Sequence, residues 1–212
     1  NFAQSEEGLE KLRFTGMIIA RALMQGFLVP VQFTKPFLKQ ILHHGDKIKP
    51  EDLEDVSEEL YNQLQKIKQY DFDKVDLDLR FEVDFEGKTT ELIEKGSEIK
   101  VDNKNKEEYI RLRSLHRMKD AITKQVSAFC DGFDSILPHE KVRMFTPTEL
   151  CLLICGVPNI DVDDLRRNVE FKKPYDINSP VIKLFFNTIK KWDDENLAKL
   201  LIFITGTSRV PS

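Results

Sequence analysis

The sequence of 212 residues has few of the features that define several large classes of protein. It contains only three cysteines, nine glycines and nine prolines. Its longest unbroken apolar run, Leu150–Cys155, is far shorter than the roughly 20 residues that a membrane-spanning helix needs. The charges nearly balance at a net −4, so there is no excess of positive charge for nucleic acid or an anionic membrane surface. We therefore expect no membrane span, and neither a membrane nor a nucleic acid as partner.

Signals for secretion are also missing. No Asn-x-Ser/Thr sequon occurs, and the first residues lack the basic and then apolar pattern of a signal peptide. The few, unevenly spaced cysteines do not form a disulfide framework. We expect a soluble intracellular protein with reduced thiols, located in the cytoplasm or the nucleus.

The cysteines do not make a complete catalytic site. A nucleophilic site needs an activated Cys, Ser or Lys beside a base. Cys130 lies in a helical pattern, and Cys151 and Cys155 are four residues apart with no histidine near them in the sequence. We interpret all three as buried, inert thiols and predict no catalytic residue in this chain. The alternative, a thiol hydrolase that uses Cys151 or Cys155, would require a thiol with a lowered pKa.

The four histidines do not show the spacing of metal ligands. His43 and His44 are adjacent, so on a helix their side chains would diverge by about 100° and would not chelate one ion as an i,i+4 pair does. His116 and His139 are isolated, and no glycine-rich phosphate loop is present. We predict no metal site and no cofactor.

Most of the chain has the apolar period of helices. One buried helix face should run from Leu9 to Phe27 and close near Gly26. Further helices should run from Thr34-Pro36 to Gly45, through Leu60 and Ile67 to about Tyr70, and within residues 105–133. We predict three more helix starts, each with an oxygen-bearing side chain that can accept from free backbone N–H groups, at Thr146, Ser179 and Asp193. Helices should stop at Gly156 and Gly206.

One stretch has a period of two instead. Six apolar residues alternate with charged ones, which places them on one face of a strand: Val75, Leu77, Leu79, Phe81, Val83 and Phe85. Shorter segments follow around Leu92 and residues 99–101. The predicted fold class is mainly α with a small antiparallel β-sheet (α+β).

Seven segments, spread over nearly the whole chain, carry a family resemblance: Arg13–Leu23, Asp78–Phe85, Gly96–Leu112, Gln125–Phe133, Phe145–Gly156, Asp161–Phe171 and Ile202–Pro211. In this order they resemble the N-terminal lobe of a HECT-type ubiquitin-protein ligase. The resemblance implies that residues 1–212 form this lobe. Within it, a helical large subdomain (1–54 and 114–212) would carry an inserted small α/β subdomain (55–113).

The resemblance also implies a function. The lobe would recruit a ubiquitin-charged conjugating enzyme, and ubiquitin would pass by transthioesterification to a cysteine in a C-terminal lobe and then to a substrate lysine. In the family that cysteine lies in a Thr-Cys-Phe motif after a segment like Thr205–Pro211, so we expect both ends of the lobe to be trimmed here and this chain alone to be inactive. Substrates would bind through regions outside it. The alternative is a non-catalytic helical interaction module of similar shape.

The resemblance further implies a docking groove on the insert for a phenylalanine of the conjugating enzyme. Its lining residues would be Leu60, Leu64, Tyr70, Leu77, Leu79 and Tyr109. Core and groove roles stay open for the four leucines, whereas the two tyrosines favour the groove because a ring with a polar tip suits a half-wet interface.

Three further positions receive expectations from the resemblance. Arg113 stands where some members have an aromatic residue. Asp55 and Arg113, at the ends of the insert, are candidate pivots for its movement. Arg209 is expected at the junction between the lobes, where it would pair with acids of the other lobe or cap the helix that ends near Gly206.

Overall fold

The structure, a computed structural model, describes residues 5–74, 77–85, 87–156 and 161–205. The chain folds into two compact units, and each is described by itself. Unit 1 comprises residues 1–21 and 33–148, and unit 2 comprises residues 22–32 and 149–212. Within the described ranges, no helix is both long enough and apolar enough to cross a bilayer.

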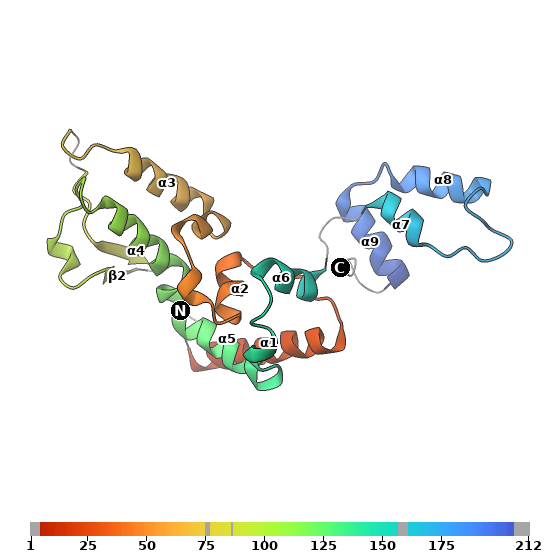
Figure 1. Cartoon of the computed structure of the whole chain (residues 1–212), viewed down its shortest axis with the longest axis horizontal. Coiled ribbons are helices and arrows are strands. Elements are labelled where there is room, and N and C mark those ends of the chain that lie inside the picture. The colour runs from red at the N-terminus through yellow and green to blue at the C-terminus, as the bar shows by residue number, and fades with distance from the viewer. Residues whose placement is uncertain (1–4, 75–76, 86, 157–160, 206–212) are drawn as a thin grey trace. The chain divides into compact units, whose positions relative to one another are not determined.

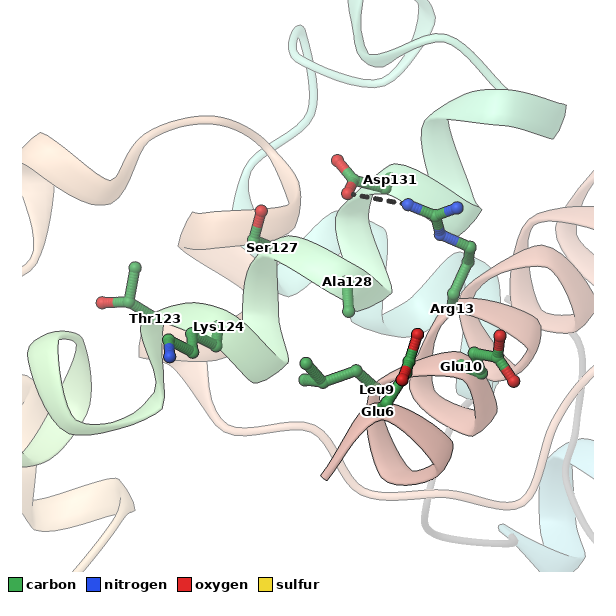
Figure 2. A pocket seen from close by; sticks show the side chains of 9 residues that line it. All are labelled: Glu6, Leu9, Glu10, Arg13, Thr123, Lys124, Ser127, Ala128 and Asp131. Carbon is green, nitrogen blue, oxygen red and sulfur yellow. Dashed lines mark hydrogen bonds and ion pairs between the residues drawn. The ribbon is translucent and has the colours of Figure 1, made fainter. Parts of the chain in front are cut away.

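Helices α1 (Glu6–Gln25) and α5 (Thr123–Ile136) meet at two glycines in unit 1. A Cβ atom on Gly16 would overlap the carbonyl oxygen of Phe129, and one on Gly132 would overlap that of Arg13. The two backbones therefore approach more closely than any side chain allows. Figure 2 shows Arg13 of α1 reaching Asp131 of α5, where their charged atoms lie 3.4 Å apart.

The predicted helix after Thr34-Pro36 is α2 (Lys35–Ile41), which ends before Gly45, so the expected end was wrong. Its end is fixed by two backbone hydrogen bonds, from the N–H of His43 to the carbonyl of Gln40 (3.0 Å) and from that of His44 to the carbonyl of Lys39 (2.7 Å). His43 has φ 56°, the left-handed conformation that closes a helix in this type of turn.

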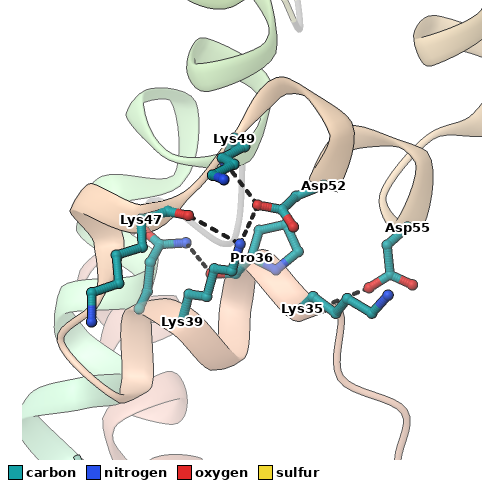
Figure 3. Close-up of polar contacts among 8 residues, drawn as sticks. Lys35, Pro36, Lys39, Lys47, Lys49, Asp52 and Asp55 are labelled. Atoms are coloured by element: carbon teal, nitrogen blue, oxygen red, sulfur yellow. Dashed lines mark hydrogen bonds and ion pairs between the residues drawn. The ribbon is translucent and has the colours of Figure 1, made fainter. Parts of the chain in front are cut away.

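A polar network ties α2 to the 3₁₀ helix η3 (Pro50–Asp55) (Figure 3). Asp52 accepts from the backbone N–H of Lys49 at 2.8 Å and forms an ion pair with Lys39. Asp55 accepts from the backbone N–H of Lys35 at 2.6 Å. A carboxylate from 20 residues away therefore satisfies a donor in the first turn of α2, where a negative charge is favourable.

The part of unit 1 that follows contains two helices and a hairpin. Helix α3 (Glu58–Gln69) packs against α4 (Lys106–Met118) (Figure 1), and Ser57 caps α3 by accepting from the N–H of Leu60. Strands β1 (Glu82–Phe85) and β2 (Lys88–Glu91) form a two-stranded antiparallel sheet, in which Glu82 pairs with Glu91 and Phe85 with Lys88. The fold class, mainly α with a small antiparallel sheet, is confirmed.

The strand predicted over residues 75–85 is shorter than expected. Asp78 has φ 45°, which interrupts extended backbone, and residues 75–76 lie outside the described ranges. Before β1, an isolated bridge pairs Arg80 with Lys100, and the N–H of Val101 donates to the carbonyl of Leu79. The predicted alternation nevertheless holds where the strand forms, because Phe81 and Val83 are buried and Asp84 is exposed.

The helical pattern of residues 105–133 belongs to two helices, α4 and α5, separated by the 3₁₀ helix η5 (Asp120–Ile122). The break occurs at Lys119, whose φ of −133° and ψ of −64° are not helical. Among the described residues of unit 1, short 3₁₀ helices also occur at η2 (Gly45–Lys47), η4 (Gly96–Glu98) and η6 (His139–Lys141).

Unit 2 contains α7 (Val162–Asn168), α8 (Pro180–Ile189), α9 (Asp194–Thr205) and most of α6 (Pro147–Cys155). Its core consists of Val162, Phe186, Ile189 and Leu197. The predicted caps have different outcomes. Asp193 accepts from the N–H of Asn196 at 2.9 Å, but Ser179 makes no cap bond and instead pairs with Asp176. Gly156 ends α6 with φ 68°, and Gly206 lies outside the described residues.

We predict that Gly16→Ala lowers the free energy of unfolding by about 1–3 kcal/mol, because the new methyl group pushes the α1 and α5 backbones apart. Gly45→Ala is the matched control, since the nearest atom to its Cβ would be at an ordinary 3.7 Å, and it should change stability by less than about 0.5 kcal/mol. Urea unfolding of both variants checks this, and equal effects would contradict the close approach.

Candidate functional site

The predicted insert (residues 55–113) has a small core that it shares with its flanking residues. Buried side chains from η3, α3, α4 and the segments around β1 form this core: Ile48, Leu53, Leu64, Phe81, Val101, Tyr109, Ile110 and Met118. We call this group the insert core. None of the structural findings sets the boundaries of the insert at residues 55 and 113, which stay a prediction.

Phe81 and Tyr109 hold the insert core together. Their rings meet edge to face with centroids 5.5 Å apart, a favourable arrangement for aromatic pairs. The backbone of Phe81 also joins the neighbouring segments, because its N–H donates to the carbonyl of Gly96 at 3.1 Å and its carbonyl accepts from the N–H of Leu92 at 2.8 Å. Burial raises the pKa of the Tyr109 phenol, and the nearby charge of Arg113 opposes that rise.

The six predicted groove residues divide into three groups by exposure. Leu64 and Tyr109 are 3% and 6% exposed and belong to the insert core. Leu60 and Leu79 are partly buried against it. Tyr70 and Leu77 are 39% and 36% exposed. Of the six, only Tyr70 and Leu77 thus present a large accessible surface to a partner in this structure.

The segment from Ile99 to Lys106 is hydrogen-bonded to two of the predicted groove residues. The Lys106 ammonium donates to the carbonyl of Tyr70 at 2.7 Å. The N–H of Val101 donates to the carbonyl of Leu79, two residues after Leu77, at 2.8 Å. Ile99 is itself exposed, and sequence reasoning missed it because it lies in an expected strand. We call Tyr70, Leu77 and Ile99 the exposed apolar set.

A polar frame holds the loop that follows Tyr70. The Asn103 side chain accepts from the N–H of Phe72 at 3.1 Å and donates to the Asp71 carboxylate at 2.9 Å. Its hydrogen bond to Asp71, followed by that of Lys74, lowers the pKa of the Asp71 carboxyl group. Asp71 is therefore ionised at neutral pH and keeps the backbone next to Tyr70 in place.

The surroundings of Cys130 and Cys155 disfavour a reactive thiolate. Burial, with smaller contributions from Asp134 and Asp131, raises the pKa of the Cys130 thiol to about 12. Cys155 is buried, and Cys151 is half-buried. Since the reactive species is the thiolate, these surroundings do not activate Cys130 or expose Cys155.

Three further positions, Arg209, Arg113 and Asp55, received expectations from the resemblance, and the structure describes two of them. Arg209 lies outside the described residues. Arg113 is half-buried on α4, and its charge, after burial, contributes to lowering the pKa of His116. Asp55 is held by its hydrogen bond to Lys35. The part of unit 1 around the insert core thus exposes apolar side chains at Tyr70, Leu77 and Ile99.

Comparison with known proteins identifies relatives over the whole chain. The model of the family described as HECT-domain (ubiquitin-transferase) matches residues 1–212. The E3 ubiquitin-protein ligase NEDD4 of Homo sapiens is 40% identical over 211 residues, which cover 98% of this chain and 16% of that protein. UPL2 of Arabidopsis thaliana, also an E3 ubiquitin-protein ligase, is 37% identical over 222 residues, which cover 100% of this chain and 6% of that protein.

A third relative, the E3 ubiquitin-protein ligase Nedd-4 of Drosophila melanogaster, is 38% identical over 209 residues, with 98% of this chain and 21% of that protein covered. The chain thus spans about a fifth or less of the length of these curated relatives.

Alanine substitution of a buried and of an exposed leucine should change the free energy of unfolding by different amounts. We predict that Leu64→Ala lowers the free energy of unfolding by about 2–5 kcal/mol, because it leaves a cavity in the insert core. Leu77→Ala removes an exposed side chain and should cost less than about 1 kcal/mol. Urea unfolding measures both, and a small cost for Leu64→Ala would contradict its place in the core.

Proposed function

Because the chain belongs to the HECT-domain (ubiquitin-transferase) family, we propose that it recruits a ubiquitin-charged conjugating enzyme for a ubiquitin-protein ligase. The observation that carries this proposal is the family match over residues 1–212, together with identities of 37–40% to ubiquitin ligases. Ubiquitin then passes from the conjugating enzyme to a cysteine of the ligase and from there to a substrate lysine.

In this proposal the conjugating enzyme binds the insert beside the segment Ile99–Lys106. Two features support this position. Tyr70, whose carbonyl accepts from Lys106, and Leu77 are exposed, and Leu60 and Leu79 offer partly buried apolar surface next to the insert core. Tyrosine is enriched among the residues that supply most of the energy at protein interfaces, and the burial of apolar surface adds to that energy. The buried Leu64 and Tyr109 would act mainly by holding this surface in shape.

The cysteine that accepts ubiquitin lies elsewhere in the ligase. The raised pKa of Cys130 and the burial of Cys155 support this view. Transfer between two thiols is nearly balanced in energy, so the contribution of this chain is to bring the charged conjugating enzyme into position. The partners of the proposed function are a conjugating enzyme, ubiquitin and a substrate that binds outside this chain.

A binding titration tests the proposal. The full chain is titrated with a panel of ubiquitin-conjugating enzymes, and at least one should bind with an affinity on the order of 1 μM, or about −8 kcal/mol, because the carrier must be released after each transfer. Tyr70→Ala and Leu77→Ala should each remove about 2 kcal/mol, which weakens binding roughly thirtyfold.

Leu153→Ala is the matched control, since Leu153 is 37% exposed, as Leu77 is, but lies on α6 outside the insert. It should leave the affinity unchanged. If no conjugating enzyme of the panel binds, recruitment by this chain is wrong. If one binds and neither insert variant weakens it, the docking surface is wrong while recruitment stands.

A further inference from the structure

Three side chains that can bind a metal ion meet near the end of α2 in unit 1. His43 follows α2, Asp134 belongs to α5, and His139 begins η6. Their ligand atoms all lie within 4.8 Å of one another. Nε2 of His43 is 2.8 Å from Oδ2 of Asp134, and the rings of His43 and His139 have centroids 4.2 Å apart and are tilted by 32°.

His43 occupies a position that favours glycine. The turn that ends α2 needs a residue with positive φ, and His43 adopts φ 56° there. Glycine reaches this conformation without the steric cost of a Cβ atom, so a histidine at this position is less stable unless its side chain makes a compensating contact. The contact with Asp134 provides one and aims the imidazole at the other two ligands.

The Asp134 carboxylate has an unused oxygen. Oδ2 faces His43, whereas Oδ1 is buried and has no hydrogen-bond partner among the residues that the structure describes. A buried acceptor without a partner is costly. A cation bound between Asp134 and the two histidines would reduce that cost.

We propose that His43, Asp134 and His139 bind a divalent transition-metal ion, with Zn²⁺ as the first candidate. Two imidazoles and one carboxylate suit Zn²⁺, whereas Ca²⁺ and Mg²⁺ prefer oxygen ligands. Three protein ligands leave a fourth position, which water can fill from the exposed side of His43.

The distances fit after a small adjustment. In a tetrahedral site with bonds of 2.0–2.2 Å, ligand atoms lie about 3.3 Å apart. The widest pair here would close by up to about 1.5 Å, and the His43 and Asp134 atoms, now 2.8 Å apart, would separate by about 0.5 Å. Rotation of the two imidazole rings about their side-chain bonds can supply this movement, since His43 is exposed and His139 half-buried. The bound ion would link the end of α2, α5 and η6.

A zinc titration tests the site. The full chain, without a polyhistidine tag and freed of metal by a chelator, is titrated with ZnCl₂ in competition with a chromophoric chelator. One Zn²⁺ per chain should bind with a dissociation constant on the order of 1 μM or less. His43→Gly, Asp134→Asn and His139→Gln should each weaken binding by about tenfold or more.

His43→Gly is the sharpest variant, because glycine suits the end of α2 and the fold should persist. Zn²⁺ should raise the unfolding temperature of the unsubstituted chain and not that of His43→Gly. His44→Gln and Cys151→Ser are the controls and should keep the affinity. No binding tighter than about 100 μM, or equal affinity in the three ligand variants and the unsubstituted chain, would overturn the proposal. A loss in His44→Gln as large as in His43→Gly would overturn it too.

Discussion

The contact between Phe81 and Tyr109 is the constraint on which the proposed docking surface depends. A subdomain of this size has little interior, so the few side chains that fill it also decide which ones stay outside. Phe81, Leu64 and Tyr109 fill this interior, whereas Leu77, before β1, and Tyr70, after α3, stay accessible. Stability of the insert and exposure of its apolar surface are therefore two results of the same packing.

Sequence patterns predicted the helices well and the connections poorly. The apolar period of the helix around Leu60 and the glycine at residue 26 led to correct positions, because both signals are local. The end of α2 and the length of the first strand were wrong for a common reason. His43 and Asp78 adopt positive φ although neither is glycine, and each side chain contacts a residue distant in the sequence, Asp134 for His43 and Lys100 for Asp78.

Sequence patterns also fail to tell which residues of the candidate site are buried and which are exposed. A period of two or of 3.6 tells which residues share a face, but it does not tell whether that face meets the core or a partner. The resemblance placed both Leu64 and Tyr70 at the groove, with a core role left open for Leu64 and the groove favoured for Tyr70, and the structure shows that Leu64 is buried and Tyr70 exposed. The sequence did not predict the proposed metal ligands, because His43 and Asp134 are 91 residues apart and no spacing rule connects them.

Two-dimensional amide NMR of the isotope-labelled chain, recorded with and without a conjugating enzyme, shows whether the enzyme binds the surface that the insert exposes. If it does, the changed signals should cluster at the exposed apolar set and the segment Ile99–Lys106, while those of α8 and α9 keep their positions. Changes confined to α8 and α9, with the insert signals unmoved, would contradict binding at that surface.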